Sequence, residues 1–371
     1  MKIIILEHAL AHYRKDVFEK LINHPDFSIE IIGGEDFKEI KSLGKPYTSF
    51  PYKKTSFLGH EFYYLKGIIN YISTKKPDVI ICTGFDPHLI HTILLFIAHK
   101  IILSKKFIWW SHGTTGNQGR LGFIFRRFFY KNSDGVLVYS QKGRDNLRNM
   151  NVDTDNIKIV GNSLNNEDYG FLNLNLPTSA VNPHKKFTIL FCGRITPSKK
   201  IDVLIQSLSI LKINHQIDLK CIIIGGGDSS ALKTLTKQLQ LEDVVEFTGA
   251  KYGNETFPYF LNADLFVYPG GVGLSLLQAF SFGLPVITTD NLILHGPEIE
   301  LLSPGKNGDL CKDEDTEDFA RTILTWHKKI IENKLQIRVN CIESIKEKRY
   351  LPNDMYQTII DFLNKKLIKH S

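Results

Sequence analysis

Short apolar runs alternate with longer, partly polar segments along almost the whole chain. Runs such as Ile3–Leu6, Val79–Cys82 and Phe107–Trp110 contain no charged side chain. Continuous apolar runs of this length are typical of parallel strands that are covered on both faces. Segments between the runs, such as Pro87–Ile102 and Ile201–Leu211, have the composition and length of helices. The alternation predicts an α/β protein with doubly wound parallel sheets.

Some elements are less clearly marked than the others. After an irregular stretch at residues 35–60, we expect a helix at His60–Thr74. Two helices, Glu317–Asn333 and Leu335–Lys346, are expected near the C-terminus, followed by a last helix after Pro352.

The alternation is interrupted by a polar segment rich in Asn and Pro, within residues 162–186. A chain of 371 residues is long enough for two domains. We therefore predict a Rossmann-like domain at 1–165, a linker at 166–186 and a second Rossmann-like domain at 187–350. The helix at about 353–371 is expected to pack back on the first domain. Loops that follow parallel strands bind ligands, so two such domains predict a cleft on which these loops converge.

The basic surplus of the chain lies in its N-terminal half. The formal net charge is +7, and residues 1–183 hold 23 Lys and Arg against 17 Asp and Glu. This surplus favours an anionic partner or, alternatively, a solvated lysine-rich surface. The segment Arg120–Lys131 combines four cations with five aromatic residues. It is interpreted either as a contact with an anionic membrane surface or as a core helix with a basic outer face.

Other features of the sequence indicate in which cellular compartment the protein works and which class of partner it binds. The five cysteines form no CxxC pair, which favours buried thiols in a reducing compartment. We expect no signal peptide and no transmembrane helix, since the apolar stretch 89–103 is too short to span a membrane. We therefore expect a cytoplasmic protein, either free or peripheral on the inner face of the plasma membrane. No basic and aromatic strand motif is present, so no nucleic-acid partner is expected.

Two loops that follow predicted strands have the chemistry of an anion site. Gly193–Lys200 carries Arg194 and Lys199, two cations that repel each other unless an anion lies between them. Asp264–Asp290 has the composition of a strand, a glycine loop, a helix and a strand, and the amides at such a helix N-terminus bind anions. The alternatives are two exposed surface cations and an ordinary glycine-rich turn.

A metal site is not expected. The one DxD sequence, Asp153–Asp155, precedes the predicted strand Ile157–Val160 and so lies at the wrong end of the sheet for the cleft. We interpret it as a solvated turn. The histidines form no metal-binding pattern with the cysteines.

The second half contains, in order, GRITPSKKIDVLIQSL, IIIGGG, EFTGA, ADLFVYPGGVGLSLLQAFSFGLPVIT and PEIELLSPGKNGDL. This series resembles the motifs of retaining GT-B glycosyltransferases, the nucleotide-sugar-dependent enzymes of family 4 (glycosyl transferases group 1). The similarity is weaker in the first half, at Trp110–Gly113, NSDGVLVYS and IKIVGN. The resemblance implies the GT-B fold, in which two Rossmann-like domains face each other across a cleft. It also implies a nucleoside-diphosphate sugar as donor and no metal or other cofactor.

The resemblance implies roles for individual residues. Arg194 and Lys199 match the pair that holds the donor diphosphate, and His112 matches a histidine near the donor sugar, so these three are the catalytic candidates. His12 and Arg14, on the loop that the family uses for acceptors and phosphates, are the acceptor-binding candidates. The remaining donor-binding candidates are Gly273, Leu274 and Ser275 at the distal phosphate, Thr248, Gly249 and Ala250 at the nucleobase, Gln278 at the ribose, and Gly193 and Glu298. Gly193 and Glu298 are assigned to the donor site without a specific contact.

The chain also departs from the family pattern. Gly270 and Gln278 occupy the positions of two glutamates that contact the donor sugar and the ribose, and Lys200 replaces the usual glycine after Lys199. The resemblance implies an EC 2.4 hexosyltransferase that acts on a glycan or lipid-linked glycan in surface polysaccharide, lipopolysaccharide or capsule synthesis. Two alternatives stay open: a GT-B sugar-nucleotide epimerase, which would need carboxylates in the cleft, and an inactive nucleotide-sugar-binding protein.

Overall fold

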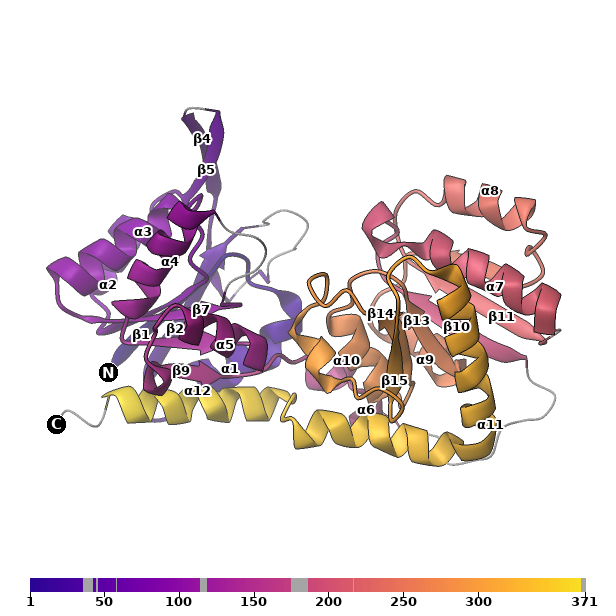
Figure 1. Ribbon diagram of the computed structural model, residues 1–371. Coiled ribbons are helices and arrows are strands. Elements are labelled where there is room, and N and C mark those ends of the chain that lie inside the picture. Colours follow the sequence, from indigo (N-terminus) through magenta and orange to yellow (C-terminus); the bar gives the residue numbers. More distant parts are fainter. Residues whose placement is uncertain are drawn as a thin grey trace. The chain divides into compact units, whose positions relative to one another are not determined.

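The chain folds into two compact units, which are described separately (Figure 1). Unit 1 comprises residues 1–165 and 350–371, and unit 2 comprises residues 166–349. The computed structural model describes residues 1–35, 43–44, 46–57, 59–113, 119–174, 186–215 and 217–367. Of the predicted linker, residues 175–185 lie outside this range, and so do residues 368–371 of the predicted C-terminal helix. Residues 166–174 belong to unit 2.

Unit 1 contains, in its described residues, a seven-stranded sheet with the order β3-β2-β1-β6-β7-β8-β9, in which all paired strands are parallel. This confirms the predicted doubly wound sheet. The strands are β1 (Lys2–Glu7), β2 (Ser28–Gly34), β3 (Thr48–Phe50), β6 (Val79–Thr83), β7 (Lys106–Ser111), β8 (Gly135–Val138) and β9 (Ile157–Ile159).

Helices cover both faces of this sheet because successive strand residues point to opposite sides. Ile3 and Ile5 of β1 pack in one core with α1 and α12, and Ile4 and Leu6 pack in a second core with α2, α3 and α4. The helices are η1 (His12–Arg14), α1 (Lys15–Ile22), α2 (Ile68–Lys75), α3 (Ile90–Leu95), the π-helix η2 (Phe96–Ile102), α4 (Arg120–Lys131), α5 (Gln141–Asn149), η3 (Thr154–Asn156) and α12 (Pro352–Leu367). The C-terminal α12 thus belongs to the core of unit 1, and Figure 1 shows it in yellow beside α1 and β9.

The helix expected at His60–Thr74 is wrong in its first half. Residues His60–Leu65 form strand β5, which pairs antiparallel with β4 (Tyr52–Phe57), and a helix begins only at Ile68. The sequence of β5 is HEFYYL, and its aromatic residues favour a strand. Gly59 has φ +77°, a value that suits the turn between the two strands. The hairpin projects from unit 1 in Figure 1.

Unit 2 has the same construction. Its described residues form a six-stranded sheet with the order β12-β11-β10-β13-β14-β15, again with parallel pairs. The strands are β10 (Phe187–Cys192), β11 (Leu219–Ile224), β12 (Val245–Gly249), β13 (Leu265–Tyr268), β14 (Val286–Thr289) and β15 (Gly308–Cys311). The helices are η4 (Asn166–Asp168), α6 (Gly170–Asn173), η5 (Pro197–Lys199), α7 (Ile201–His215), α8 (Ser230–Gln238), η6 (Gly253–Thr256), α9 (Phe257–Asn262), α10 (Leu274–Ser281), η7 (Pro297–Leu301) and α11 (Thr316–Glu347).

Unit 2 differs from the expected elements at its C-terminal helices and at strand β15. The two C-terminal helices are one element, α11, with non-helical φ −136° and ψ 32° at Asn333, so the expected break is present as a kink. Strand β15 was not anticipated, since Gly308 and Asp309 are poor strand formers. The strand forms because it pairs with β14. The indole of Trp326 on α11 also donates a hydrogen bond to Asp309 over 3.0 Å.

We predict that Phe362→Ala on α12 will destabilise unit 1 by about 3–5 kcal/mol, the usual cost of truncating a buried phenylalanine. The Phe362 ring is 4% exposed, and it lies so close to β8 that a Cβ on Gly135 would fall 2.4 Å from it. Urea unfolding followed by fluorescence measures the effect, with the exposed Lys365→Ala as the control on the same helix. Equal stability of the two variants would contradict the packing of α12 on unit 1.

Candidate functional site

Arg194 and Lys199 lie on the loop that leaves β10 at its carboxyl end, as the sequence predicts. The side chain of Arg194 is exposed, whereas Lys199 is half-buried and its Nζ donates to the carbonyl of Gly271 over 3.0 Å. Nζ also lies 5.1 Å from the ring centre of Tyr268. Burial, and then the charge of Arg194, lower the pKa of Lys199. The two cations are therefore close enough to repel each other, which an anion between them would relieve.

Two glycines bring neighbouring loops onto this cation-bearing loop. A Cβ on Gly270 would lie 2.3 Å from the carbonyl oxygen of Ser198 and 2.7 Å from the Cα of Lys199. A Cβ on Gly225 would lie 2.0 Å from the carbonyl oxygen of Gly193. Any side chain at these positions would push the backbones apart. The glycine at 270 is thus required by the packing of the cation-bearing loop.

The glycine loop leads into α10, as predicted. Gly273 is the residue before the helix, and Leu274 and Ser275 form its first turn, so their amides point out of the helix N-terminus. Burial raises the pKa of Tyr268, at the end of β13, to about 12, and a hydrogen bond with Ser275 and the charge of Arg194 oppose the rise. These contacts bring Tyr268 into the group formed by the cations and the helix N-terminus.

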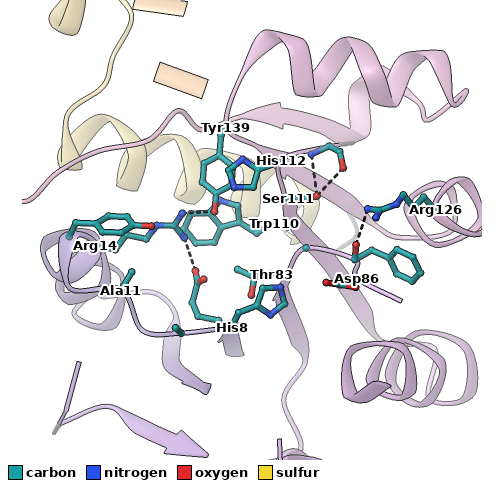
Figure 2. A pocket seen from close by; sticks show the side chains of 16 residues that line it. His8, Ala11, Arg14, Thr83, Asp86, Trp110, Ser111, His112, Arg126 and Tyr139 are labelled. Carbon is teal, nitrogen blue, oxygen red and sulfur yellow. Dashed lines mark hydrogen bonds and ion pairs between the residues drawn. The ribbon is translucent and has the colours of Figure 1, made fainter. Parts of the chain in front are cut away.

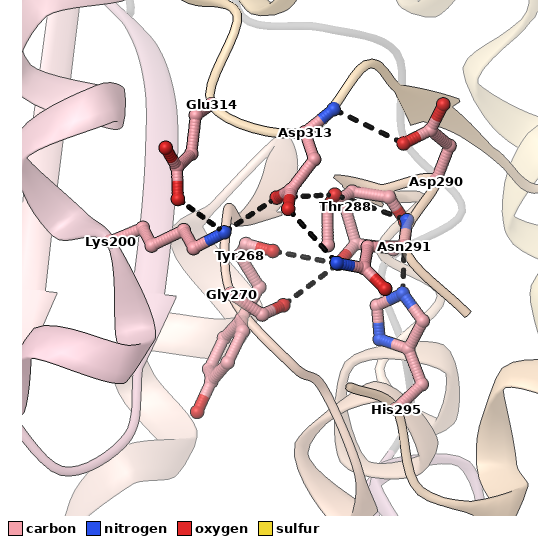
Figure 3. A network of polar contacts seen from close by, with 10 residues as sticks. Lys200, Tyr268, Gly270, Thr288, Asp290, Asn291, His295, Asp313 and Glu314 are labelled. Carbon is pink, nitrogen blue, oxygen red and sulfur yellow. Dashed lines mark hydrogen bonds and ion pairs between the residues drawn. The ribbon is translucent and has the colours of Figure 1, made fainter. Parts of the chain in front are cut away.

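A polar network holds the neighbouring loops at this edge of the sheet (Figure 3). Asp313 accepts hydrogen bonds from Lys200 Nζ over 2.7 Å, from Thr289 Oγ1 over 2.8 Å and from Asn291 Nδ2 over 3.0 Å. Burial would raise the pKa of Asp313, but these hydrogen bonds lower it to about 2. Lys200 also forms an ion pair with Glu314 over 2.9 Å. The network therefore connects the cation-bearing loop to the loops that follow β14 and β15.

A histidine connects the same network to the glycine loop. His295 Nδ1 accepts the amide hydrogen of Val272 over 3.1 Å, and Nε2 lies 2.8 Å from the carbonyl oxygen of Thr289. Nδ1 therefore carries no hydrogen, and Nε2 is the donor. Thr288 Oγ1 donates to the carbonyl oxygens of Tyr268, over 2.7 Å, and of Gly270, over 3.2 Å.

The remaining predicted donor-binding residues lie at the end of β12, on α10 and on η7 of unit 2. Thr248 and Gly249 end β12 and Ala250 follows it, and the amide of Gly225 donates to the carbonyl oxygen of Gly249 over 2.9 Å. Gln278 lies on α10 and donates to Thr256 Oγ1 at 3.5 Å. Glu298 is 1% exposed, and its Oε2 lies 3.6 Å from the position of a Cβ on Gly273. Glu298 thus lies beside the glycine loop.

Unit 1 contains a separate cavity of about 270 Å³ at the carboxyl ends of β1, β6 and β7 (Figure 2). Arg14 lies in its wall and is 5% exposed. Its Nη1 lies 3.1 Å from Glu7 Oε1, its Nη2 donates to the hydroxyl of Tyr139 over 2.5 Å, and its guanidinium is 5.1 Å from the ring centre of Trp110. Burial raises the pKa of Glu7 to about 7, against the opposing charge of Arg14. Arg14 is therefore already paired with a carboxylate and enclosed by aromatic rings.

The other two predicted residues of unit 1 differ in their position. His112 lines the cavity, with its ring centre 4.4 Å from that of Tyr139. Desolvation beside the cavity, and then the charge of Arg14, lower the pKa of His112, although its side chain as a whole is exposed. His12 is exposed and is not among the cavity-lining residues. The structure thus brings His112 and Arg14, but not His12, to the cavity.

No metal centre is indicated in the described part of the chain, where no group of three or more His, Cys, Asp or Glu could hold an ion. Asp153–Asp155 is exposed at the amino end of β9, as the sequence predicts. Among the described residues, no helix is long and apolar enough to cross a membrane.

Comparisons with known proteins match both units. Residues 175–348 match the family described as Glycosyl transferases group 1, and residues 30–168 match Glycosyltransferase Family 4. The chain belongs to the family 4 type of GT-B glycosyltransferases. This membership confirms the fold and the family that the motifs indicated.

Individual relatives of this glycosyltransferase are distant. WcaL of Escherichia coli K12, a putative colanic acid biosynthesis glycosyltransferase, is 30% identical over 154 residues, which is 39% of this chain and 37% of WcaL. The solved structure of the lipopolysaccharide outer core galactosyltransferase WaaB has a TM-score of 0.70 at 16% identity, with 99% of this chain and 100% of WaaB covered. Anabaena Alr3699/HepE in complex with UDP has a TM-score of 0.72 at 16% identity, with 98% and 100% covered, and HepE has also been solved with UDP-glucose. The aligned region thus spans little more than a third of the curated relative.

Several residues around the candidate site of the glycosyltransferase were not predicted from its sequence. Tyr268, Thr288 and Asp313 support the loops in unit 2, and Glu7 and Tyr139 hold Arg14 in unit 1. Tyr268, Thr288 and Glu7 lie at or next to the carboxyl end of a parallel strand, and this position is the signal that could have identified them. Tyr139 directly follows β8 and shares this signal, whereas Asp313 gains its importance from contacts with Lys200, Thr289 and Asn291, which are far away in the sequence.

We predict that Gly270→Ala will destabilise unit 2 by about 1–3 kcal/mol, because overpacking a tight contact forces the backbone to move. Gly270→Glu should be at least as destabilised, since its Cβ meets the same backbone atoms. Thermal unfolding measures both effects. Gly226→Ala is the matched control on a nearby loop, since its Cβ would lie 3.4 Å from Ala250, an ordinary contact. Wild-type stability of Gly270→Glu would contradict the described packing.

Proposed function

We propose that this protein is a retaining glycosyltransferase that moves a hexose-type sugar from a nucleoside diphosphate to a glycan or lipid-linked glycan acceptor. The observation that carries the proposal is the meeting of Arg194, Lys199 and the N-terminus of α10 at one edge of the sheet in unit 2. Two cations and a set of helix amides suit a diphosphate better than a single phosphate or a carboxylate.

The chemistry of sugar transfer makes use of this arrangement. When the bond between the sugar and the diphosphate breaks, negative charge grows on the phosphate oxygens. Arg194, Lys199 and the amides of Leu274 and Ser275 would stabilise this charge, each with about 1.5–3 kcal/mol for a hydrogen bond to a charged group. Lys199 is held in place by Gly271 and Tyr268 before any ligand binds, so little reorganisation is needed during the reaction.

We propose that these fixed cations take the place of a metal ion, so that transfer needs no divalent cation. In a retaining reaction on the same face of the sugar, the departing phosphate can accept the proton of the acceptor hydroxyl, and no dedicated base is assigned. His112 would contact the donor sugar, and Gln278 would contact the ribose. Arg14 would support the acceptor side through the wall that it forms with Glu7 and Tyr139.

The relatives favour a role in surface polysaccharide synthesis. WcaL is named for colanic acid biosynthesis, and WaaB is a galactosyltransferase of the lipopolysaccharide outer core. HepE has been solved with UDP and UDP-glucose, which favours a uridine nucleotide as the first donor to test.

We expect one of the UDP-, GDP- or dTDP-sugars to raise the melting temperature, with and without EDTA, and we expect no shift with CMP-sugars, which carry a single phosphate. Arg194→Ala should lose that shift and nearly all turnover, since it removes one of the two cations that balance the leaving group. Arg321→Ala on α11 is the matched control, because its exposed guanidinium lies on another element of unit 2. Product formation from the stabilising donor is followed by chromatography.

Wild-type turnover in Arg194→Ala would rule out the diphosphate site. A shift that EDTA abolishes would overturn the metal-free mechanism. Binding of the donor without any transfer or hydrolysis would favour the inactive nucleotide-sugar-binding protein instead.

We also propose that unit 1 lies on an anionic membrane surface through α4 and η2. Large apolar side chains are exposed on both elements, including Ile124 at 57%, Phe125 at 59% and Ile102 at 71%. Unit 1 holds 26 Lys and Arg against 17 Asp and Glu, a net charge of +9, whereas unit 2 has a net charge of −2. Exposed aromatic and aliphatic groups beside cations are typical of surfaces that bind anionic lipids. The side chain of Arg120 lies outside the described residues.

We expect the protein to sediment with vesicles that contain phosphatidylglycerol but not with pure phosphatidylcholine vesicles. Phe125→Ser combined with Ile124→Ser should reduce the bound fraction several-fold, because two exposed apolar groups leave the interface. Ile213→Ser on α7 of unit 2 is the matched control, since Ile213 is 72% exposed. Equal binding of both variants would contradict the assignment of α4 to the membrane.

A further inference from the structure

We propose that the cavity of unit 1 binds an uncharged sugar ring, the terminal residue of the acceptor, with Asp86 as its polar contact. The proposal rests on the proposed function and adds the chemical class of the acceptor. The proposal predicts that the acceptor ends in a neutral sugar. The presence of Arg14 in the sequence would, taken alone, suggest a phosphorylated sugar instead.

The size of the cavity suits one ring. Its volume is about 270 Å³, just under the lower limit of about 300 Å³ for pockets that enclose drug-sized ligands. A nucleoside diphosphate sugar is much larger than one ring and does not fit. Ala9, Ala11 and Phe85 supply apolar walls, and His8, Thr83 and Asp86 supply polar groups on neighbouring strand ends (Figure 2). Apolar walls with a few fixed polar groups match a sugar, which has both apolar C–H and polar hydroxyl groups.

The charges in the cavity do not favour an anion. The guanidinium of Arg14 is paired with Glu7 over 3.1 Å and is surrounded by the rings of Tyr13, Trp110 and Tyr139 at 5.0–5.7 Å. A phosphate would have to break this buried pair, and an unpaired buried carboxylate costs several kcal/mol. The second cation, Arg126, donates through Nη1 to the carbonyl oxygen of Phe85 over 3.1 Å. With Asp86 also in the wall, the positive charges of the two arginines and the negative charges of the two carboxylates balance above neutral pH, where Glu7 is ionised.

Asp86 is the group best placed to hold a hydroxyl. It follows β6 and is half-buried, and its Oδ1 accepts the amide hydrogen of His88 over 2.9 Å, which fixes the carboxylate. Among the described residues, no hydrogen-bond partner is recorded for its Oδ2. Thr83 Oγ1 donates to the carbonyl oxygen of Leu6 over 3.0 Å, so its lone pairs can accept a second hydrogen bond. A carboxylate and a hydroxyl oxygen together can accept two hydroxyl hydrogens of one ring.

The two acceptor classes also differ in their pH dependence. Glu7 has a raised pKa of about 7, so below neutral pH its protonation leaves Arg14 uncompensated. An anionic ligand would then bind more tightly at pH 6 than at pH 8, whereas a neutral ring would not respond to this change. The other titratable or charged groups that face the cavity are His8, Tyr13, Asp86, His112, Arg126 and Tyr139.

The test compares matched pairs of ligands on the full chain. The probes are the methyl α-glycosides of glucose, galactose and mannose and the 6-phosphates of the same glycosides, titrated by saturation-transfer NMR at pH 6 and pH 8. We expect at least one neutral glycoside to bind, with an affinity at least tenfold higher than that of its 6-phosphate and equal at the two pH values. A 6-phosphate that binds more tightly, or whose binding strengthens at pH 6, would overturn the proposal, and so would the absence of binding by every neutral glycoside.

A variant locates the contact. Asp86→Asn should lower the affinity for the glycoside about tenfold and raise the KM for the acceptor. The kcat and the rise in melting temperature with the donor should not change. Asp26→Asn, an exposed aspartate of the same unit, is the matched control. Unchanged glycoside binding in Asp86→Asn would overturn the assignment of Asp86. If the sugar nucleotide raises the melting temperature but no glycoside binds, only this inference is contradicted. If a glycoside binds but no sugar nucleotide raises the melting temperature, the proposed donor is contradicted.

Discussion

Backbone crowding at the carboxyl edge of the sheet in unit 2 is the constraint on which the candidate donor site depends. The backbone of Gly225 lies against that of Gly193, Gly270 lies against Ser198 and Lys199, and a Cβ on Gly271 would fall 2.2 Å from the carbonyl oxygen of Leu294. Four loops thereby meet in a space that admits no extra side chain. This packing places two cations and the N-terminus of α10 close together, which ordinary surface loops with mobile side chains would not achieve.

In unit 1, the buried cation of the cavity is paired with a carboxylate. Its cavity contains a buried arginine, but Glu7 and the hydroxyl of Tyr139 occupy two of its donor groups. In unit 2 no carboxylate is described in an ion pair with Lys199, and burial and Arg194 lower its pKa. Under the proposed function, unit 2, where Lys199 and Arg194 lie close enough to repel each other, takes the anionic donor, and unit 1, where Glu7 pairs with Arg14, takes the neutral part of the acceptor.

Local sequence patterns predicted the parts of the structure that depend on local physics. Continuous apolar runs identified most strands, and the positions of Arg194 and Lys199 after a strand placed both on one loop. Strand β15 depends on pairing with β14, and the pairing of Arg14 with Tyr139 joins residues 125 positions apart. The contact of Lys200 with Asp313 joins residues 113 positions apart. Such contacts are decided by tertiary packing, which a single sequence does not reveal.

Two of the departures from the family pattern in unit 2, Gly270 and Lys200, lie on loops that pack against each other. Lys200 has φ +51°, a left-handed conformation that costs a non-glycine residue roughly 1–2 kcal/mol. Its ion pairs with Asp313 and Glu314 offset this cost and fix the loop 197–200 in place. This loop fills the space that a side chain at position 270 would need, since a Cβ on Gly270 would meet the backbone of Ser198 and Lys199. A glutamate at 270 alone would therefore not recreate the usual family site, because the loop that excludes it would remain anchored.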